Sequence, residues 1–342
     1  MSVATEITRL QNAKSALKTA INAKNDVSHQ IDDETIDDYA TFVGDIQNGA
    51  YNIESVVEDD FQDLNMTDYD YTPTTTTPTA SATATSGVTY THILGRLTFA
   101  EINKYAKAIS NASDIDNTTT DVYIDDGNNH YVLSVGDTIC YVLSNDEIMV
   151  DSIIGFNHDD LTSSTAYGEA TTTGKAGITF QMEDCFTTLY AMNDTYTNLG
   201  GWGASKMRTT TLPAIKLTMP SDLQSVIKMV NKKAANGGSS NYTETETLSD
   251  DLFLLSEIEV LGTATNSKEG SNEGSQYLGV IKDKVNSSKA DYITFWWLRS
   301  CPYSNTTSFM ILSRWYNHNY YNGMSYSYSS DSALGLSFAY CI

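Results

Sequence analysis

The sequence predicts a mixed α+β fold, and three observations support this class. Apolar residues recur at helical spacing in only a few segments, short runs of β-branched and aromatic residues are more numerous, and long polar loops separate them. No repeat recurs at the period of a solenoid. We divide the 342 residues into a helical segment (1–50), a linker (51–87) and one α+β domain (88–342).

The helical segment is predicted to be a hairpin of two helices, over 4–24 and about 34–47. The first helix carries apolar residues at the a/d spacing of a coiled coil, at Ile7, Leu10, Leu17 and Ile21. It is too short to form a stable coiled coil alone. The second helix follows three acids, 32–34, which suit the positive end of a helix dipole. The hairpin either anchors or oligomerises the chain, or it packs on its own chain as an ordinary amphipathic hairpin.

The linker is acidic and mixed up to about residue 71, and then consists almost entirely of Thr, Pro, Ser and Ala up to Gly87. This composition favours extended, solvated chain and marks the clearest domain boundary. The alternative is a long surface strand packed against a neighbouring subunit.

Within 88–342 the patterns predict further elements in the following order. Helices are expected over 98–109, 180–192 and, behind Pro220, 222–234; strands are expected over 131–133, 138–143, 149–156, 252–261 and 293–298. Residues 263–275 read as a polar loop. Trp296 and Trp297 point to opposite faces of the last strand as framework residues, one in the core and one against a loop or subunit. Arg299 is expected to donate hydrogen bonds to loop carbonyls.

The net charge of −23 argues against nucleic-acid binding, which needs clustered Lys and Arg, and against anionic membranes. No apolar stretch approaches the ~20 residues of a membrane helix, and the polar N-terminus shows no secretory signal. The four cysteines are far apart and form no CxxC, so we expect reduced, buried thiols. Neither His nor Asp has the spacing of a metal site, and we expect no metal and no cofactor.

Catalysis is not expected either. His158 stands beside Asp159 and Asp160, but no G-x-S-x-G or cysteine motif supplies a nucleophile, so we interpret these residues as a structural loop. Gly200-Gly201-Trp202-Gly203 lacks the spacing of a phosphate-binding loop and predicts a tight turn that leads into a helix at Ala204.

The last 47 residues are the most informative part of the chain. Of the 30 residues in 303–332, six are Tyr, eight Ser and four Asn, and 301–342 contains no Lys, Glu or Gln. Tyr provides rigid contact area at low entropic cost, while Ser and Asn provide adaptable hydrogen bonds, as in antibody paratopes. The apolar flanks, 296–298 and 334–342, read as core strands. Rigid flanks around such an interior predict a recognition surface; the alternative is a disordered Ser/Tyr-rich segment.

Several motifs add a family resemblance over roughly 90–342. The start W-W-L-R-S at 296–300, the finish G-L-S-F-A-Y-C-I at 335–342 and upstream segments at 153–161, 200–208 and 252–260 resemble the variable proteins of diversity-generating retroelements. That family has a C-type-lectin fold and includes phage tropism determinants. Its variable codons scatter into Asn, Tyr, Ser, His and Asp but cannot reach Lys, Glu or Gln, and the segment here fits that rule. The resemblance implies a C-type-lectin-like display domain with a variable region at 301–334.

We therefore expect a phage receptor-binding protein on the virion tail or baseplate, assembled in the bacterial cytoplasm. It would bind a host cell-surface receptor, protein or glycan, attach to other tail proteins through the N-terminal helices, and form a homotrimer by analogy with tail fibres. The expected ligand-binding residues are Tyr303, Asn305, Tyr316, Asn317, His318, Asn319, Tyr320, Tyr321, Asn322, Tyr326, Tyr328 and Asp331. The alternatives are a structural tail or baseplate protein, and a prophage or bacterial surface adhesin of the same fold.

Overall fold

The computed structural model describes residues 76–238, 245–267, 272–282, 284, 295–303, 305–313 and 324–342. The helices expected over 4–24 and 34–47 lie outside the described residues, as does most of the expected linker. The described part has an α+β fold, as the sequence predicts.

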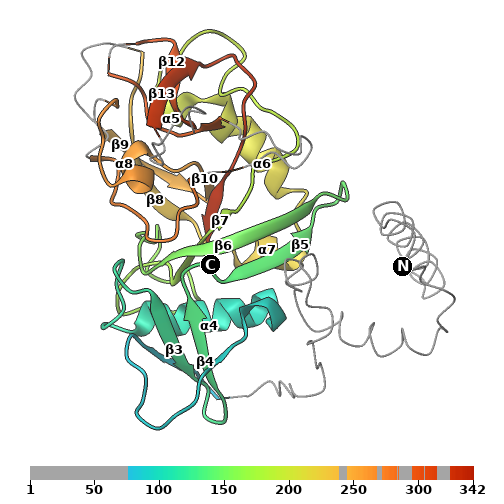
Figure 1. Cartoon of the computed structure of the whole chain (residues 1–342), viewed down its shortest axis with the longest axis vertical. Helices are drawn as coiled ribbons and strands as arrows, with labels where there is room; N and C mark the ends of the chain where they lie inside the picture. The colour runs from blue at the N-terminus through green and yellow to red at the C-terminus, as the bar shows by residue number, and fades with distance from the viewer. Residues whose placement is uncertain are drawn as a thin grey trace, which may run out of the picture. The chain divides into compact units, whose positions relative to one another are not determined.

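A five-stranded antiparallel sheet runs through the middle of the fold (Figure 1). Its strands, in spatial order, are β10 (Leu252–Phe253), β14 (Ala339–Cys341), β7 (Ile178–Met182), β6 (Ile148–Phe156) and β5 (Thr138–Val142). The last strand of the chain, β14, lies inside this sheet, and Tyr340 and Ile342 are fully buried. The C-terminal residues are therefore part of the core.

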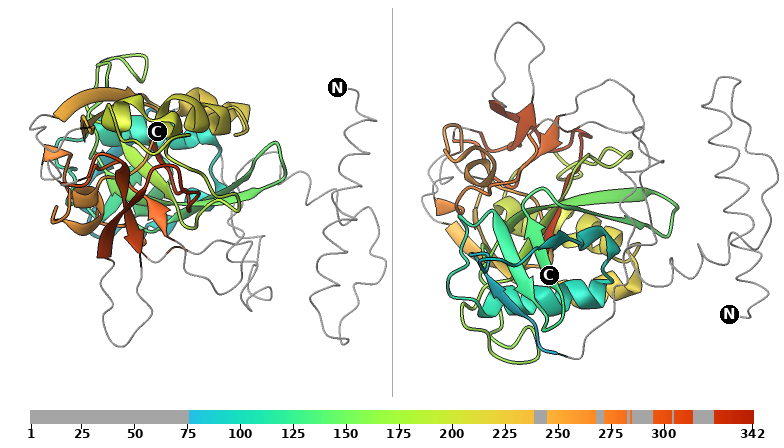
Figure 2. Two further views of the ribbon diagram at one scale, coloured as in Figure 1. Left: turned by 90° about the horizontal axis from the view of Figure 1, so that it is seen from above. Right: turned by 60° about the horizontal axis from the view of Figure 1, so that its bottom comes forward.

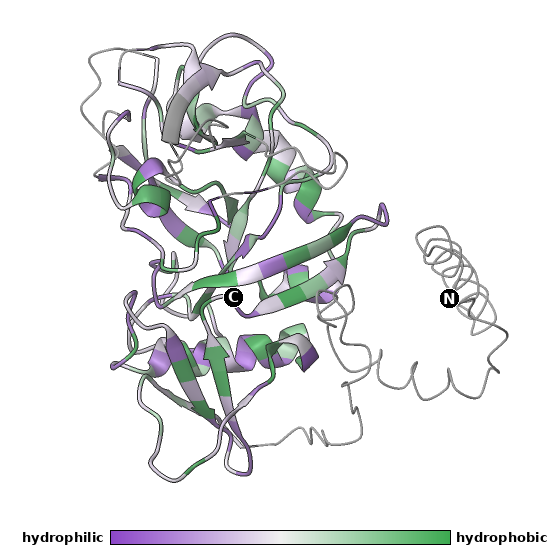
Figure 3. Cartoon of the chain, in the orientation of Figure 1, coloured by the Kyte–Doolittle hydropathy of each residue, from purple (hydrophilic) through white to green (hydrophobic). Residues whose placement is uncertain are grey.

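A helix and a second sheet pack on one side of this central sheet. Helix α4 (Phe99–Asn111) begins at a capping box in which Thr98 and Glu101 bond each other's backbone N–H groups, and its predicted apolar face is buried. In Figure 3 the helix carries both hydrophobic and hydrophilic residues, as an amphipathic helix does. Beside β7, an added Cβ on Gly177 would lie 2.0 Å from the carbonyl oxygen of Ala106, so only glycine permits this approach of helix and strand.

The second sheet has the order β1 (Thr79–Ser81), β3 (Asp121–Asp125), β4 (His130–Ser134) and β2 (Thr91–His92), and a short 3-10 turn, η2 (Leu94–Arg96), follows β2. Strand β1 pairs antiparallel with β3. Part of the expected solvated linker thus belongs to the folded sheet, where β1 is an edge strand and the β-branched Thr79 suits an extended backbone.

The remaining elements lie mostly on the other side of the central sheet from α4 (Figures 1 and 2), but α7 (Ser221–Val226) packs against α4. They comprise α5 (Gly201–Ala204), η3 (Met207–Thr211), α6 (Leu212–Lys216), α7 (Ser221–Val226), the hairpin of β8 (Val230–Ala235) and β9 (Thr245–Asp250), α8 (Glu257–Leu261), and a three-stranded sheet of β11 (Trp296–Trp297), β12 (Ser308–Ser313) and β13 (Met324–Ser329).

Several predicted elements are confirmed. The helix expected over 98–109 is α4, and the strands expected over 131–133, 138–143 and 149–156 are β4, β5 and β6. All four cysteines are free and buried.

Three predicted elements need correction. The helix expected over 222–234 ends at Val226, because the following residues turn extended and pair as β8 with β9. The helix expected over 180–192 is instead strand β7 followed by irregular chain. The strand expected over 252–261 is only β10, and α8 then begins at a capping box of Ser256 and Glu259.

Candidate binding surface

The β11–β12–β13 sheet forms a rigid base for the Tyr/Ser/Asn-rich segment. Both Trp side chains of β11 are buried, and the indole of Trp297 donates to the carbonyl of Tyr190 at 2.7 Å. The bond to Tyr190 agrees with the expectation that one of the two packs against a loop. On β12 the residues from Phe309 to Leu312 are at most 2% exposed. Since close-packed interiors resist displacement, β12 holds a fixed position in the core.

Arg299 fixes the chain just before the loop at 301–307. Its guanidinium donates to the carbonyls of Lys233 at 3.0 Å and Leu254 at 2.8 Å, and it forms a bidentate ion pair with Glu259. The expected role of Arg299 as a donor to loop carbonyls is thereby confirmed. Burial opposes the charge of Glu259, but Arg299 and Lys232 outweigh burial and lower the pKa of this carboxyl to about 2. The side chain of Arg299 is fully buried, so the pair joins four segments inside the core.

Lys232 extends this pair to Asp159. Its ammonium lies 2.6 Å from Asp159 and 2.7 Å from Glu259, and the hydroxyl of Tyr277 also donates to Asp159. All four side chains are buried. Burial raises the pKa of Asp159, but the charge of Lys232 reverses this effect and holds the pKa well below its usual range. Two acids and two bases thus compensate one another beneath the surface, as buried charges require.

Buried acids also hold the loop that carries Tyr303. Glu257 accepts hydrogen bonds from the backbone N–H groups of Asn266 and Ser267, and the carbonyl of Asn266 in turn accepts from the N–H of Tyr303 at 3.0 Å. Glu273 accepts from the N–H of Ala235 at 3.0 Å and from the hydroxyl of Ser300. Tyr303 is therefore linked through the exposed Asn266 to the buried carboxylate of Glu257.

Asn198 joins the loop at 193–200 to the loop at 301–307. Its side-chain amide donates to the carbonyls of Asn305 at 2.9 Å and Ser308 at 2.8 Å, and its side-chain oxygen accepts from the N–H of Gly238 at 2.7 Å. Its own N–H donates to the carbonyl of Thr306. Asn198 is fully buried, so its side chain exchanges water for these three bonds.

Ser330, directly after β13, joins the loop at 193–200 to the end of β13. Its hydroxyl accepts from the N–H of Thr197 at 2.9 Å and donates to the carbonyl of Thr195, and its carbonyl accepts from the N–H of Asn193. The loop at 193–200, the loop at 301–307 and the end of β13 are thus hydrogen-bonded to one another.

Four large side chains are exposed on these three joined segments: Tyr196 (59%), Leu199 (69%), Tyr303 (62%) and Tyr328 (42%). We call them the exposed cluster. Exposed charge is sparse on the same segments: Asp194 pairs with Lys206, and Asp331 accepts a hydrogen bond from the hydroxyl of Ser329. Large exposed apolar groups on an ordered, weakly charged surface are typical of interaction sites.

The residues predicted for binding fall into three groups. Tyr303, Tyr328 and Asp331 are exposed, whereas Asn305 is half-buried and accepts from the N–H and hydroxyl of Thr307. Tyr326 lies on β13, paired with Ile311 of β12. The others lie outside the described residues: Tyr316, Asn317, His318, Asn319, Tyr320, Tyr321 and Asn322. Sequence reasoning missed Tyr196, Leu199 and Asn198, whose only local signal is the turn-forming T-N-L-G-G at 197–201.

A serine does lie close to His158. The hydroxyl of Ser275 is 3.1 Å from Nε2 of His158, and Nδ1 of His158 is 3.5 Å from Asp159. However, the carbonyl oxygen of Ser275 lies at the same 3.1 Å from Nε2, so this nitrogen can donate to the backbone. In a catalytic triad the negative charge of the Asp stabilises the imidazolium of the His, but here Lys232 already compensates the charge of Asp159. The arrangement fixes the loop at 275, in keeping with the expected structural role of His158.

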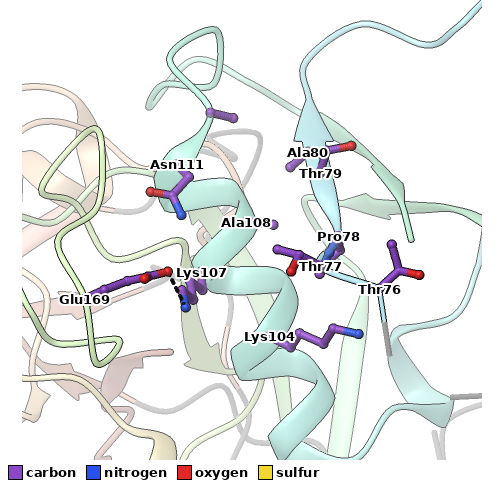
Figure 4. Close-up of a pocket in the computed structure, with 11 residues that line it drawn as sticks. Thr76, Thr77, Pro78, Thr79, Ala80, Lys104, Lys107, Ala108, Asn111 and Glu169 are labelled. Atoms are coloured by element: carbon purple, nitrogen blue, oxygen red, sulfur yellow. Dashed lines mark ion pairs between the residues drawn. The ribbon is translucent and has the colours of Figure 1, made fainter. Parts of the chain in front are cut away.

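A groove of about 370 Å³ lies elsewhere, between α4 and the chain around β1 (Figure 4). Its most evident polar feature is the ion pair of Lys107 and Glu169 at 2.7 Å. None of the predicted binding residues lines it. Within the described ranges, no His, Cys, Asp or Glu cluster is arranged to hold a metal ion, and no helix is long and apolar enough to cross a membrane.

Comparison with known proteins gives one match. Residues 176–330 match a family model described as a domain of unknown function (DUF6273). The matched range runs from the strand β7 to the end of β13, so it contains the whole of the exposed cluster and most of its supporting contacts. No curated protein and no solved structure matches the chain.

Proposed function

We propose that this chain is a phage receptor-binding protein that adheres to a host cell surface through the exposed cluster and the Tyr/Ser/Asn-rich segment beside it. The observation that carries the proposal is the contrast between the exposed side chains of this surface and the buried residues that support them. Tyr196, Leu199, Tyr303 and Tyr328 project into solvent, while the residues that hold their loops are buried and hydrogen-bonded. A rigid support keeps the entropy cost of binding low.

Composition supports the same function. Tyr is enriched among the residues that dominate binding energy at protein surfaces, and Ser and Asn adapt their hydrogen bonds to different partners. Tyr, Ser and Asn make up 18 of the 30 residues in 303–332, and along the chain the segment lies between the buried strands β11 and β14. Its exposed positions, such as Tyr303 and Tyr328, can vary without altering the core, to which β12 within the same segment belongs.

The finer parts of the proposal rest on the resemblance. We infer a C-type-lectin-like scaffold, a variable region at 301–334, attachment to the virion tail or baseplate through a helical hairpin in residues 1–50, and a homotrimer. Several copies on one virion would raise the overall affinity through effective concentration, even where a single site binds weakly. The mechanism is non-covalent and needs no cofactor.

The proposal is tested by binding of the purified full chain to intact cells from a panel of bacterial strains. We compare the wild type with a variant in which Tyr196, Leu199, Tyr303 and Tyr328 are all replaced by Ser. A matched control replaces three exposed apolar residues elsewhere, Val142, Ile148 and Leu217, by Ser. Binding of the wild type and the control, with at least a tenfold loss in the cluster variant, supports adhesion through this surface.

The outcomes also separate the alternatives. Equal loss in both variants, or no loss in either, contradicts adhesion through the cluster. If the wild type binds no strain and virions carrying the cluster variant fail to assemble, the chain is a structural tail protein. A bacterial surface adhesin would instead be found on the cell envelope of the producing strain.

A further inference from the structure

The strand β13 is the outer strand of its sheet. In the order β11–β12–β13 it pairs with β12 from Ser308↔Ser329 to Ser313↔Met324, and among the described residues no strand is paired with its other edge. In an antiparallel sheet, alternate residues of an edge strand direct their N–H and C=O groups outward. Up to three residues of β13 therefore offer main-chain donors and acceptors along this edge.

The sequence of β13 does nothing to block pairing at this edge. Natural edge strands are usually protected by Lys, Pro, bulges or inward charges. Residues 324–329 read Met-Ser-Tyr-Ser-Tyr-Ser, with no charge and no Pro, and the register with β12 is continuous. Ser327 and Tyr328 are exposed. An unprotected edge of this composition is a template for another strand.

The surroundings favour a polypeptide over a sugar. Leu199 is the most exposed member of the cluster and has no polar atom in its side chain to bond sugar hydroxyls, whereas it can pack against the apolar side chain of a protein. The loop that carries Tyr196 is bonded to Ser330, so it lies at the end of the β13 edge. Asp331, two residues after β13, is exposed and negatively charged, which suits a neutral or basic segment of a partner protein.

We infer that the receptor is a protein, and that an extended, neutral or basic segment of it adds as a strand to the edge of β13 that no described strand covers. This inference rests on the proposed adhesion and names its partner class. Main-chain hydrogen bonds along β13 supply sequence-tolerant binding, and Tyr196, Leu199 and Tyr328 supply the side-chain contacts. Such a division lets the neighbouring side chains change without abolishing attachment.

The test uses a bacterial strain that binds the full-length wild-type chain. Its cells are treated separately with a protease, which removes surface proteins, and with periodate, which oxidises glycans. Binding is also measured on untreated cells for S327K, which places an ammonium on the β13 edge, and for S327A, which leaves the backbone edge open. The matched control is T247K, the same charge at an exposed position of strand β9.

Strand addition predicts at least a tenfold loss of binding after protease treatment and little change after periodate. It also predicts at least a tenfold loss for S327K, with S327A and T247K within about twofold of the wild type. Binding that resists protease and is lost with periodate would show a glycan receptor and overturn the inference while adhesion stands. Normal binding by S327K overturns strand addition even for a protein receptor. If S327K does not fold, the protease experiment on the wild type still tests the inference, because binding that resists protease would contradict a protein receptor.

Discussion

Replacing Asn198 by Ala tests the hydrogen bonds that hold the candidate surface together. The substitution removes three bonds and leaves the carbonyls of Asn305 and Ser308 and the N–H of Gly238 without their partner. Asn198 is fully buried, so water cannot simply replace the amide. The bond to Ser308 is buried, whereas those to Asn305 and Gly238 are partly buried. A buried group left unsatisfied costs about 1–3 kcal/mol and a partly buried one costs less, so N198A should lower the free energy of unfolding by roughly 2–4 kcal/mol.

Equilibrium unfolding in urea measures this loss, with N128A as the control, because Asn128 is exposed. N128A should lie within about 0.5 kcal/mol of the wild type. N198D keeps the size of the side chain but sets a carboxylate oxygen against two carbonyls, so it should be at least as destabilising as N198A. A loss below about 1 kcal/mol for N198A would refute the reasoning, since a typical unsatisfied buried group costs at least this much.

Four further outcomes are expected. R299M leaves the buried carboxylate of Glu259 without its bidentate partner and should lower the free energy of unfolding by about 3–5 kcal/mol. R299K should recover only part of this stability, because an ammonium cannot reach all the acceptors of a guanidinium. Glu259 has a folded pKa of about 2 against an ordinary 4.5, so its contribution is complete above pH 4.5 and is lost as the pH falls through 2; acid unfolding curves of E259Q should lack this part of the pH dependence. Burial raises the pKa of Asp151 to about 6 from an ordinary 3.8, so the stability contributed by the protonated carboxyl is complete below pH 3.8 and is lost as the pH rises through 6. D151N should therefore gain stability relative to the wild type as the pH rises from 3.8 to 6. A stability difference that stays constant over this pH range would contradict this. A fluorophosphonate reagent should leave Ser275 unmodified in the folded chain, as judged by mass spectrometry, whereas stoichiometric labelling would show that His158 activates it.

The elements that could be predicted from sequence are those with strong local signals. Helix α4 has both a capping box and a buried face at helical spacing, and β6 is a long run of β-branched and apolar residues. In 222–234 the spacing of Val226 and Val230 also suits a helix, but the pairing of β8 with β9 overrides it, and that pairing is not visible in a short window. The start of α8 was visible, since Ser256 and Glu259 have the spacing of a capping box.

The candidate surface was predictable only in part for the same physical reason. Tyr303 and Tyr328 lie in a segment whose composition is unusual, so composition alone identifies them. Asn198 binds Asn305 and Ser308 over separations of 107 and 110 residues, and nothing in the local sequence predicts this approach. Tyr196 and Leu199 become candidates only once their loop is known to lie against the end of β13.

The most direct test of the account is hydroxyl-radical footprinting of the full chain, free and bound to receptor-bearing cells. On binding, Tyr196, Leu199, Tyr303 and Tyr328 should become protected, while the exposed side chains of Val142, Ile148 and Leu217 should react at unchanged rates. Unchanged reactivity of the four cluster residues in the bound chain, with protection appearing at the other three, would contradict it.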